Sequence, residues 1–148
     1  MLLCPQAGKP PQLQSIEVRR AGAHEQRLSV WEQFTLPWRA RGGLLVNFSG
    51  SAPMLARRQQ CIIHDAAVFE TPHAYTAQFL LWYRTLFRVL ALRAERLFTV
   101  SQFSKLRLVD HLRLSADRLE VLPNAGDHLD RVTADTTLVQ QLGLQPRR

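Results

Sequence analysis

Four short apolar runs that alternate with helical segments constrain the fold of this chain more than any other feature. The runs lie at residues 44–48, 60–65, 97–100 and 119–122. The first is continuously apolar with turn residues on both sides, which is typical of a buried parallel strand. Strands that alternate with helices predict an α/β protein, here a single Rossmann-like layer fold with a mostly parallel sheet.

Two helical segments separate the later runs. Residues 75–95 carry apolar side chains at helical spacing. We expect these to face the sheet: Phe79, Trp82, Leu86, Val89 and Leu90. Ser101 and Ser104 are both candidate N-caps for a second helix that runs to about residue 112. Asp117 closes the turn before the last apolar run.

The rest of the chain is less regular. Short apolar stretches predict strands at 1–4, which Pro5 stops, and at 16–19. A helix begins near Trp31, and Pro37 shortens or kinks it, because proline is excluded from helix interiors and disfavours the α conformation at Leu36. We expect this helix to end before residues 42–43. Residues 132–142 predict one more helix, with Gly143 as its stop.

The charge balance favours contact with an anionic molecule. The chain holds 19 Lys and Arg against 12 Asp and Glu, a net charge of +7. Residues 84–118 alone carry eight basic and three acidic side chains, a net of +5. Nucleic acid, membrane phosphates and a phosphorylated substrate all fit such a field, and so does an ordinary solvated helix face.

Cysteine usage and hydropathy exclude several classes of protein. The two cysteines, Cys4 and Cys61, form no CxxC pair, which argues against a disulfide framework and a structural zinc site and fits a cytoplasmic protein. The histidines show no spacing to acidic residues that indicates a metal site. Four arginines interrupt the apolar residues 79–97, and each costs about 2.5–3.5 kcal/mol at mid-membrane. This segment is therefore no membrane span, although it could lie on a membrane surface.

Polar residues follow two of the predicted strands, where α/β sheets bind ligands. The run at 60–65 ends in His64 and Asp65, and the run at 44–48 leads into a small polar loop that contains Ser51. A histidine in this position can donate a hydrogen bond to a sugar hydroxyl or to a developing charge. Asp65 points to the opposite face of a continuing strand, so we expect it to support the site as a cap or loop anchor.

Four short motifs occur in an order that is known from one family. They are Trp31-Glu32-Gln33 with Leu36-Pro37, His64-Asp65 with Pro72, Thr99-Val100-Ser101-Gln102-Phe103-Ser104, and Val121-Leu122-Pro123-Asn124. In this order they resemble the amino-terminal domain of GT-B glycosyltransferases, in particular the retaining, mannosyltransferase-like group 1 (family 4) enzymes of bacterial polysaccharide synthesis. The resemblance spans residues 30–127.

The resemblance implies a two-domain enzyme whose halves close on a cleft. Residues 1–128 would form the acceptor-side domain, and residues 129–148 would begin the linker to a donor domain that this chain lacks. The donor domain would bind the nucleotide-sugar, and no cofactor is implied. The acceptor would be a sugar or a lipid-linked sugar, and the enzyme would be cytoplasmic, with contact to the inner membrane face left open.

The resemblance also assigns roles to single residues. His64 matches the family histidine that binds and orients the transferred sugar, and it is the candidate catalytic residue. Ser101 and Ser104 would face the cleft from a helix start, where free N–H groups suit phosphate. Asn124 would mark the approach to the linker. With Ser51 and Asp65, these are the candidate substrate-binding residues.

The chain departs from the family pattern in three ways, which keep other functions open. The first strand and its glycine-rich loop have no counterpart, Ala125 replaces the glycine of Pro-Asn-Gly, and the donor half is missing. The chain is then a half enzyme that needs a partner chain, or a non-catalytic remnant of the fold. Residues 104–119 could be mistaken for a DNA-binding helix-turn-helix. Pro123 follows so soon that its recognition helix would be too short, so a nucleic-acid-binding module is disfavoured.

Overall fold

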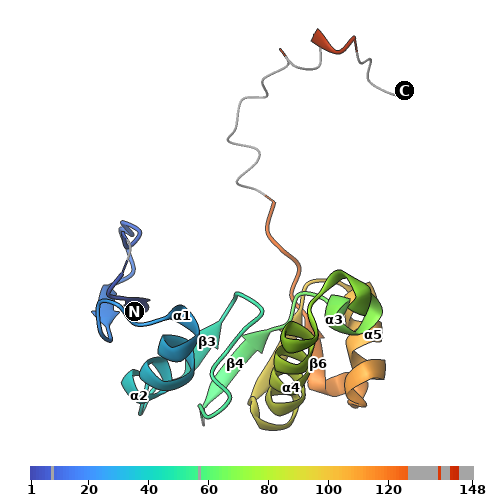
Figure 1. The fold of residues 1–148 in the computed structure, drawn as a ribbon, viewed down its shortest axis with the longest axis horizontal. Helices are drawn as coiled ribbons and strands as arrows, with labels where there is room; N and C mark the ends of the chain where they lie inside the picture. The colour runs from blue at the N-terminus through green and yellow to red at the C-terminus, as the bar shows by residue number, and fades with distance from the viewer. Residues whose placement is uncertain (8, 57, 127–136, 138–140, 144–148) are drawn as a thin grey trace.

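The computed structural model contains two parallel β-sheets with helices beside them (Figure 1). The structure describes residues 1–7, 9–56, 58–126, 137 and 141–143. A two-stranded sheet joins β1 (Leu2–Pro5) to β2 (Val18–Ala21), and a four-stranded sheet has the order β3-β4-β5-β6. The predicted α/β class with parallel strands is confirmed, although the strands are divided between two sheets.

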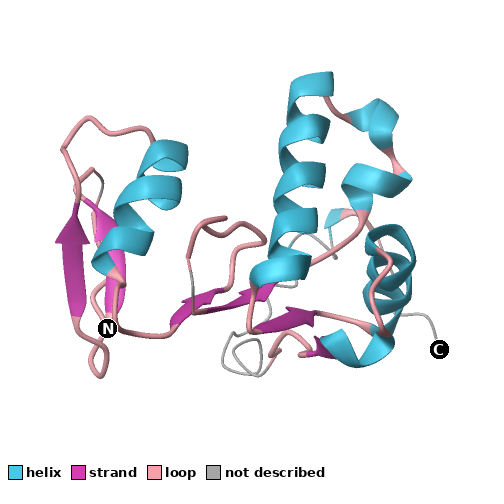
Figure 2. Ribbon diagram, turned by 90° about the horizontal axis from the view of Figure 1, so that it is seen from below, coloured by secondary structure: helices cyan, strands magenta, loops and turns pink. Residues whose placement is uncertain are grey.

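Every strand of the larger sheet lies beside the next strand in the chain. The strands are β3 (Leu45–Asn47), β4 (Gln59–Ile62), β5 (Arg96–Thr99) and β6 (Leu119–Val121), and all pairs are parallel. Helix α4 (Ala77–Arg93) connects β4 to β5, and helix α5 (Gln102–Leu112) connects β5 to β6. Both helices stand on one side of this sheet in Figure 2. These strands and helices lie close to the predicted positions.

The hydrophobic core lies between this sheet and its two helices. Alternate strand residues point to it, as the two-residue period of a strand requires, among them Cys61, Ile63 and Leu97. Leu90 of α4 and Leu108 of α5 pack against them, and all five are at most 1% exposed. This packing holds the strand ends, and the loops that follow them, in fixed positions.

The first two turns of α4 differ from the prediction. Leu86 and Leu90 are buried as expected, but Phe79 and Trp82 are each 39% exposed. Phe79 instead packs between two tyrosines, with ring centroids 5.0 Å from Tyr75 and 4.4 Å from Tyr83. The helical spacing is regular along α4, but only its carboxyl-terminal half supplies the fully buried residues of the core.

The prediction that residues 44–48 form a buried strand is wrong as to burial. β3 is parallel and lies in the predicted place, but it is the edge strand of the larger sheet. Val46 is 43% exposed and Phe48 is 66% exposed. A run of apolar residues does not distinguish an edge strand from a central one, because its neighbours are set by the tertiary fold.

The helix near Trp31 continues through Pro37 by changing its hydrogen-bond pattern. It consists of α1 (Leu28–Val30), the π-helical turn η1 (Trp31–Thr35) and α2 (Leu36–Arg39). The N–H of Leu36 donates to the carbonyl of Trp31, five residues back. Leu36 has φ −60° and ψ −51°, so the expectation that it leaves the α region is wrong. A wider turn relieves the clash of a proline ring with the carbonyl four residues earlier.

This helix is attached to the smaller sheet at a close glycine contact. The indole Nε1 of Trp31 donates to the carbonyl of Ala21 over 2.7 Å. Gly22 follows with φ +95°, and a Cβ at this position would lie 2.8 Å from Cδ1 of Trp31 and 2.5 Å from Oε1 of Gln26. Only glycine satisfies both the positive φ and the close approach.

Ser101 is the N-cap of α5, as predicted, because its Oγ accepts a hydrogen bond from the N–H of Ser104 over 3.0 Å. Ser104 is not a second cap but lies in the first turn of the helix, where it is buried. The short helix η3 (Ala116–Arg118) occupies the predicted turn at Asp117.

Most of the predicted helix at 132–142, and of the predicted linker at 129–148, lies outside the described residues. Thr137 and Gln141 are helical, and Gly143 has φ +60°, which agrees with a glycine stop. Among the residues that the structure describes, no helix is both long and apolar enough to cross a membrane.

Candidate functional site

The carboxyl ends of the four parallel strands meet at one edge of the larger sheet, and five candidate residues follow these ends. Ser51 follows β3, His64 and Asp65 follow β4, Ser101 follows β5, and Asn124 follows β6. The sixth, Ser104, lies in the first turn of α5. The parallel sheet therefore collects these residues at one edge of the molecule, as the sequence predicts.

His64 is anchored to the chain that leaves β3. Its Nε2 lies 2.7 Å from the carbonyl oxygen of Phe48. Because a carbonyl only accepts, the neutral imidazole carries its proton on Nε2, and the lone pair is on Nδ1. Thr99 Oγ1 donates to the backbone carbonyl of His64 over 3.4 Å, which fixes the main chain at the same residue.

Gly50 lies beside the imidazole. It has φ +74°, and a Cβ built there would lie 3.6 Å from Cδ2 of His64, in ordinary van der Waals contact. The glycine therefore turns the loop after β3 so that the Phe48 carbonyl and the imidazole meet.

Ser51 is held by a residue that the sequence did not single out as part of the site. Its Oγ donates to Oε1 of Glu32 over 2.6 Å. The neighbouring Gln33 donates to the carbonyl of Ala52 over 3.1 Å and accepts from the N–H of Met54 over 3.0 Å. Glu32 and Gln33 belong to the motif Trp31-Glu32-Gln33, and this motif was the feature of the sequence that could have indicated their role.

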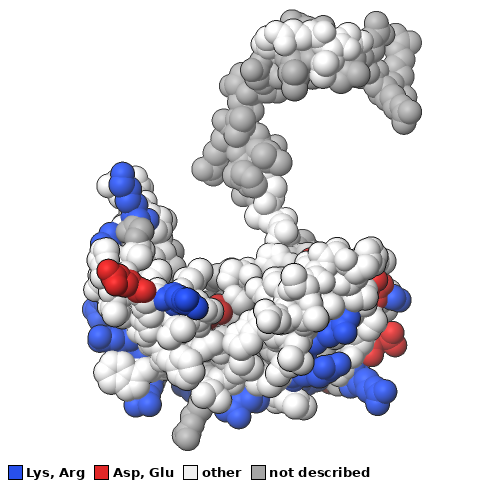
Figure 3. All heavy atoms as spheres, in the orientation of Figure 1, with Lys and Arg blue, Asp and Glu red and all other residues white. Residues whose placement is uncertain are grey.

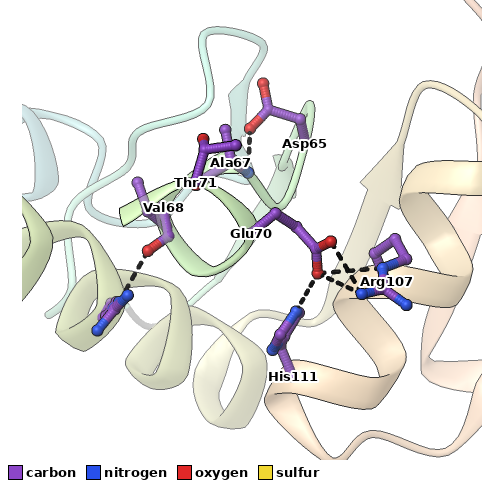
Figure 4. A network of polar contacts seen from close by, with 8 residues as sticks. Asp65, Ala67, Val68, Glu70, Thr71, Arg107 and His111 are labelled. Carbon is purple, nitrogen blue, oxygen red and sulfur yellow. Dashed lines mark hydrogen bonds and ion pairs between the residues drawn. The ribbon is translucent and has the colours of Figure 1, made fainter. Parts of the chain in front are cut away.

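Asp65 anchors the loop after β4, as predicted. Its Oδ1 accepts a hydrogen bond of 2.8 Å from the N–H of Ala67, at the start of α3 (Ala67–Glu70) (Figure 4). The side chain is exposed, so it can still meet a ligand while it holds the turn.

The serines of α5 bond to each other. The Oγ of Ser101 donates to the Oγ of Ser104 over 3.0 Å and also accepts from the Ser104 N–H, so this N–H is not free for a phosphate. Asn124 is exposed beyond β6. The roles of these three residues in substrate binding stay predictions.

A charged cluster behind the His64 loop was not expected from the sequence. Arg107 of α5 donates to both carboxylate oxygens of Glu70, over 2.7 and 2.8 Å, and His111 bonds to the same carboxylate (Figure 4). The hydrogen bonds from Arg107 and from His111 lower the pKa of Glu70, and the bond to Glu70 raises the pKa of Arg107. The partners are 37 and 41 residues apart, so no local pattern indicated the cluster.

The Glu70 cluster is tied to α4 through Phe69. The imidazole of His111 stacks on the Phe69 ring at 5.0 Å, and Arg84 lies 5.7 Å from the centre of the same ring. Arg84 also donates to the carbonyl of Val68 over 2.8 Å. Helix α3, which starts two residues after Asp65, is thereby fixed to both α4 and α5.

Cys61 lies in β4 but is not a nucleophile. It is 1% exposed, and burial raises the pKa of its thiol to about 11, although a weak contact from Asn47 lowers it slightly. The thiol is thus protonated at neutral pH. In the described part of the chain, no group of three or more His, Cys, Asp or Glu side chains could hold a metal ion.

The edge as a whole offers hydrogen bonds rather than strong nucleophiles. The hydroxyl of Ser51, the imidazole of His64 and the carboxylate of Asp65 suit a polar ligand such as a sugar. No protein-family model, no curated protein and no solved structure matches this chain.

Proposed function

We propose that this chain is the acceptor-side half of a retaining GT-B glycosyltransferase that uses a nucleotide-sugar donor. The observation that carries the proposal is the position of His64. It follows the end of a parallel strand, and its ring is held by the Phe48 carbonyl. The order of the four sequence motifs supports the same function.

In the proposed reaction, His64 binds and orients the transferred sugar. Its Nδ1 accepts a hydrogen bond from a sugar hydroxyl, because the Nε2 proton is engaged by the Phe48 carbonyl. The expectation that His64 donates to the ligand is therefore wrong for the neutral ring. The bond between the anomeric carbon and the nucleotide diphosphate breaks, the acceptor oxygen forms the new glycosidic bond, and the acceptor proton passes to the departing diphosphate oxygen. Ser51 and Asp65 contact the same substrates from the adjacent loops.

The proposed reaction requires a donor half in addition to residues 1–148. A second Rossmann-like domain would hold the nucleotide diphosphate, either further along the same protein or on a partner chain. The acceptor is a sugar or a lipid-linked sugar in polysaccharide or glycoconjugate synthesis, in the cytoplasm or at the inner face of the membrane.

The test is sugar transfer in the presence of a donor domain. If the DNA downstream of the codon for Arg148 or a neighbouring gene encodes such a domain, that domain is used, and transfer is measured from labelled nucleotide-sugars. His64→Ala is expected to reduce transfer by about 10²-fold or more. His73→Ala, at an exposed histidine of the short helix η2 (Pro72–Ala74), is the matched control and should leave transfer unchanged.

Two outcomes would count against the proposal. Transfer that is unaffected by His64→Ala would remove His64 from the mechanism. No transfer with any supplied donor domain would favour a non-catalytic remnant of the fold.

A further inference from the structure

A groove with apolar walls lies at the opposite end of β3 from His64. Its volume is about 730 Å³, within the range of roughly 300–1,000 Å³ that is usual for small-molecule sites. Helix α2 and η1 form one wall, and the start of β3 and the loop before β4 form the other. The apolar side chains that line it are Phe34, Pro37, Trp38, Leu45, Leu55 and Ala56.

The walls of this groove carry large apolar side chains that the core does not use. Phe34 is 66% exposed, Trp38 is 55% exposed and Leu55 is 64% exposed. Phe34 and Trp38 are four residues apart on one helix, so they lie on the same face. Exposed aromatic side chains gathered at a concave surface are typical of binding sites, because they lose little conformational entropy on binding.

The charged side chains described in the groove are cationic. Arg41 and Arg58 line it, and none of its described lining residues is acidic. The guanidinium carbons of Arg39 and Arg41 lie 5.1 and 5.9 Å from the centre of the Trp38 ring. Figure 3 shows basic side chains along the rim of the molecule that includes α2. Arg58 also pairs with Glu95 over 3.2 Å, so among the described lining residues Arg41 is the arginine with no acidic partner.

The amide of Gln33, which also lines the groove, has no free group for a ligand. Both ends of the Gln33 amide are engaged, with the carbonyl of Ala52 and the N–H of Met54. A nucleotide needs several hydrogen bonds to its base and ribose, and among the uncharged side chains described in the lining only the indole N–H of Trp38 could make one. A protein partner usually needs about 800 Å² of surface, more than a small-molecule groove offers.

We propose that this groove binds one molecule of a single-chain amphiphilic anion, namely an alkyl chain with a phosphate head group. The chain lies between Phe34 and Trp38 on one side and Leu55 on the other, and the phosphate pairs with Arg41. The groove is remote from the end of β4, so this proposal does not depend on the proposed glycosyl transfer.

The test is isothermal titration calorimetry of the full chain with alkyl phosphates, at concentrations at which the alkyl phosphates are monomeric. Dodecyl phosphate should saturate at one molecule per chain. Each methylene removed from the alkyl chain should weaken binding about fourfold, as expected for transfer from water to an apolar site. Neutral dodecyl maltoside and inorganic phosphate should bind at least about tenfold more weakly, because each lacks one half of the ligand.

Variants locate the site. Trp38→Ala and Arg41→Gln should each weaken binding of dodecyl phosphate about tenfold. Trp82→Ala and Arg93→Gln change the same residue types on α4 and should leave binding unchanged. Leu55→Asp, at an exposed loop position, places a negative charge in the groove without altering the helix, and should abolish binding even if the helix variants fail to fold.

Three results would overturn the proposal. They are equal weakening by Trp82→Ala, equal binding of inorganic phosphate and dodecyl phosphate, and binding to anionic phospholipid vesicles without binding of the free alkyl phosphate. The last result would assign the surface to a membrane instead.

Discussion

The Nε2 atom of His64 lies 2.7 Å from the carbonyl oxygen of Phe48, so the loop that follows β4 is tied to the loop that follows β3. The contact joins two neighbouring strand ends and determines which nitrogen of His64 faces a ligand. It also connects the candidate catalytic residue to Phe48, which lies at the end of an exposed edge strand.

The tautomer of His64 is the most direct consequence. Neutral His64 should carry its proton on Nε2, because the Phe48 carbonyl can only accept a hydrogen bond. Nitrogen-15 correlation spectra of the imidazole rings at neutral pH distinguish the two tautomers. His73, which is exposed, serves as the reference ring in the same spectra. A His64 signal from the Nδ1–H tautomer would contradict the contact.

Glu70 should make stability depend on acid pH. Its carboxylate accepts hydrogen bonds from Arg107 and His111, which lower its pKa below the ordinary value of 4.5. As the pH falls, Glu70 is therefore protonated in the unfolded chain before it is protonated in the folded chain. The stabilisation is present above pH 4.5 and is lost as the pH falls through the lowered pKa of the folded chain. Urea unfolding across this range should show that Glu70→Gln reduces both the stability at neutral pH and its loss in acid.

The control for Glu70 is another acidic residue in an ion pair. Glu120 pairs with Arg96 over 3.6 Å at the surface. Glu120→Gln should change the pH dependence little, since exposed pairs contribute little to stability. Equal effects of the two variants would show that the bidentate ion pair at Glu70 contributes no more to stability than the surface pair at Glu120.

Cys61 should resist alkylation in the folded protein. Burial raises the pKa of its thiol to about 11, so only a small fraction is thiolate at pH 8. Iodoacetamide should label Cys61 at least about a hundredfold more slowly than the partly exposed Cys4, as followed by peptide mass spectrometry. Unfolding in urea should remove the difference. Equal rates in the folded state would place Cys61 in contact with solvent.

Truncation of two leucines of α4 should change the free energy of unfolding by very different amounts. Leu90 is 1% exposed in the core, and Leu90→Ala should lower the free energy of unfolding by about 2–5 kcal/mol. Leu92 is 82% exposed, and Leu92→Ala should change it by about 0.5 kcal/mol or less. Urea unfolding of the three proteins measures both values, and similar losses would mean that α4 is rotated about its axis.

Local patterns predicted the order and type of the elements well. The strands near 97–100 and 119–122, and the end of α5 at Leu112, follow from short-range rules of periodicity and capping. Ser101 was identified as a cap because its hydroxyl bonds within its own turn. Such features depend on residues only a few positions apart, which the sequence displays directly.

Burial was predicted less well, since it depends on which element lies alongside. Phe79 and Trp82 have the spacing of a core stripe, but they lie on the exposed first half of α4. Val46 looks like a residue of a central strand, yet β3 has a neighbour on one side only among the described strands. Pro37 predicts a short or kinked helix that ends before residues 42–43. The helix does end at Arg39, but a π-turn accommodates the proline within it.

The sequence by itself determined the α/β class, the parallel arrangement and the placement of Ser51, His64, Asp65 and Ser101 after strands, because these depend on periodicity and on polar residues at strand ends. Only the tertiary structure decided that the Phe48 carbonyl orients His64 and that Glu70 meets Arg107. Those contacts join residues 16 and 37 positions apart. Such contacts arise from how the layers pack, and no local pattern encodes them.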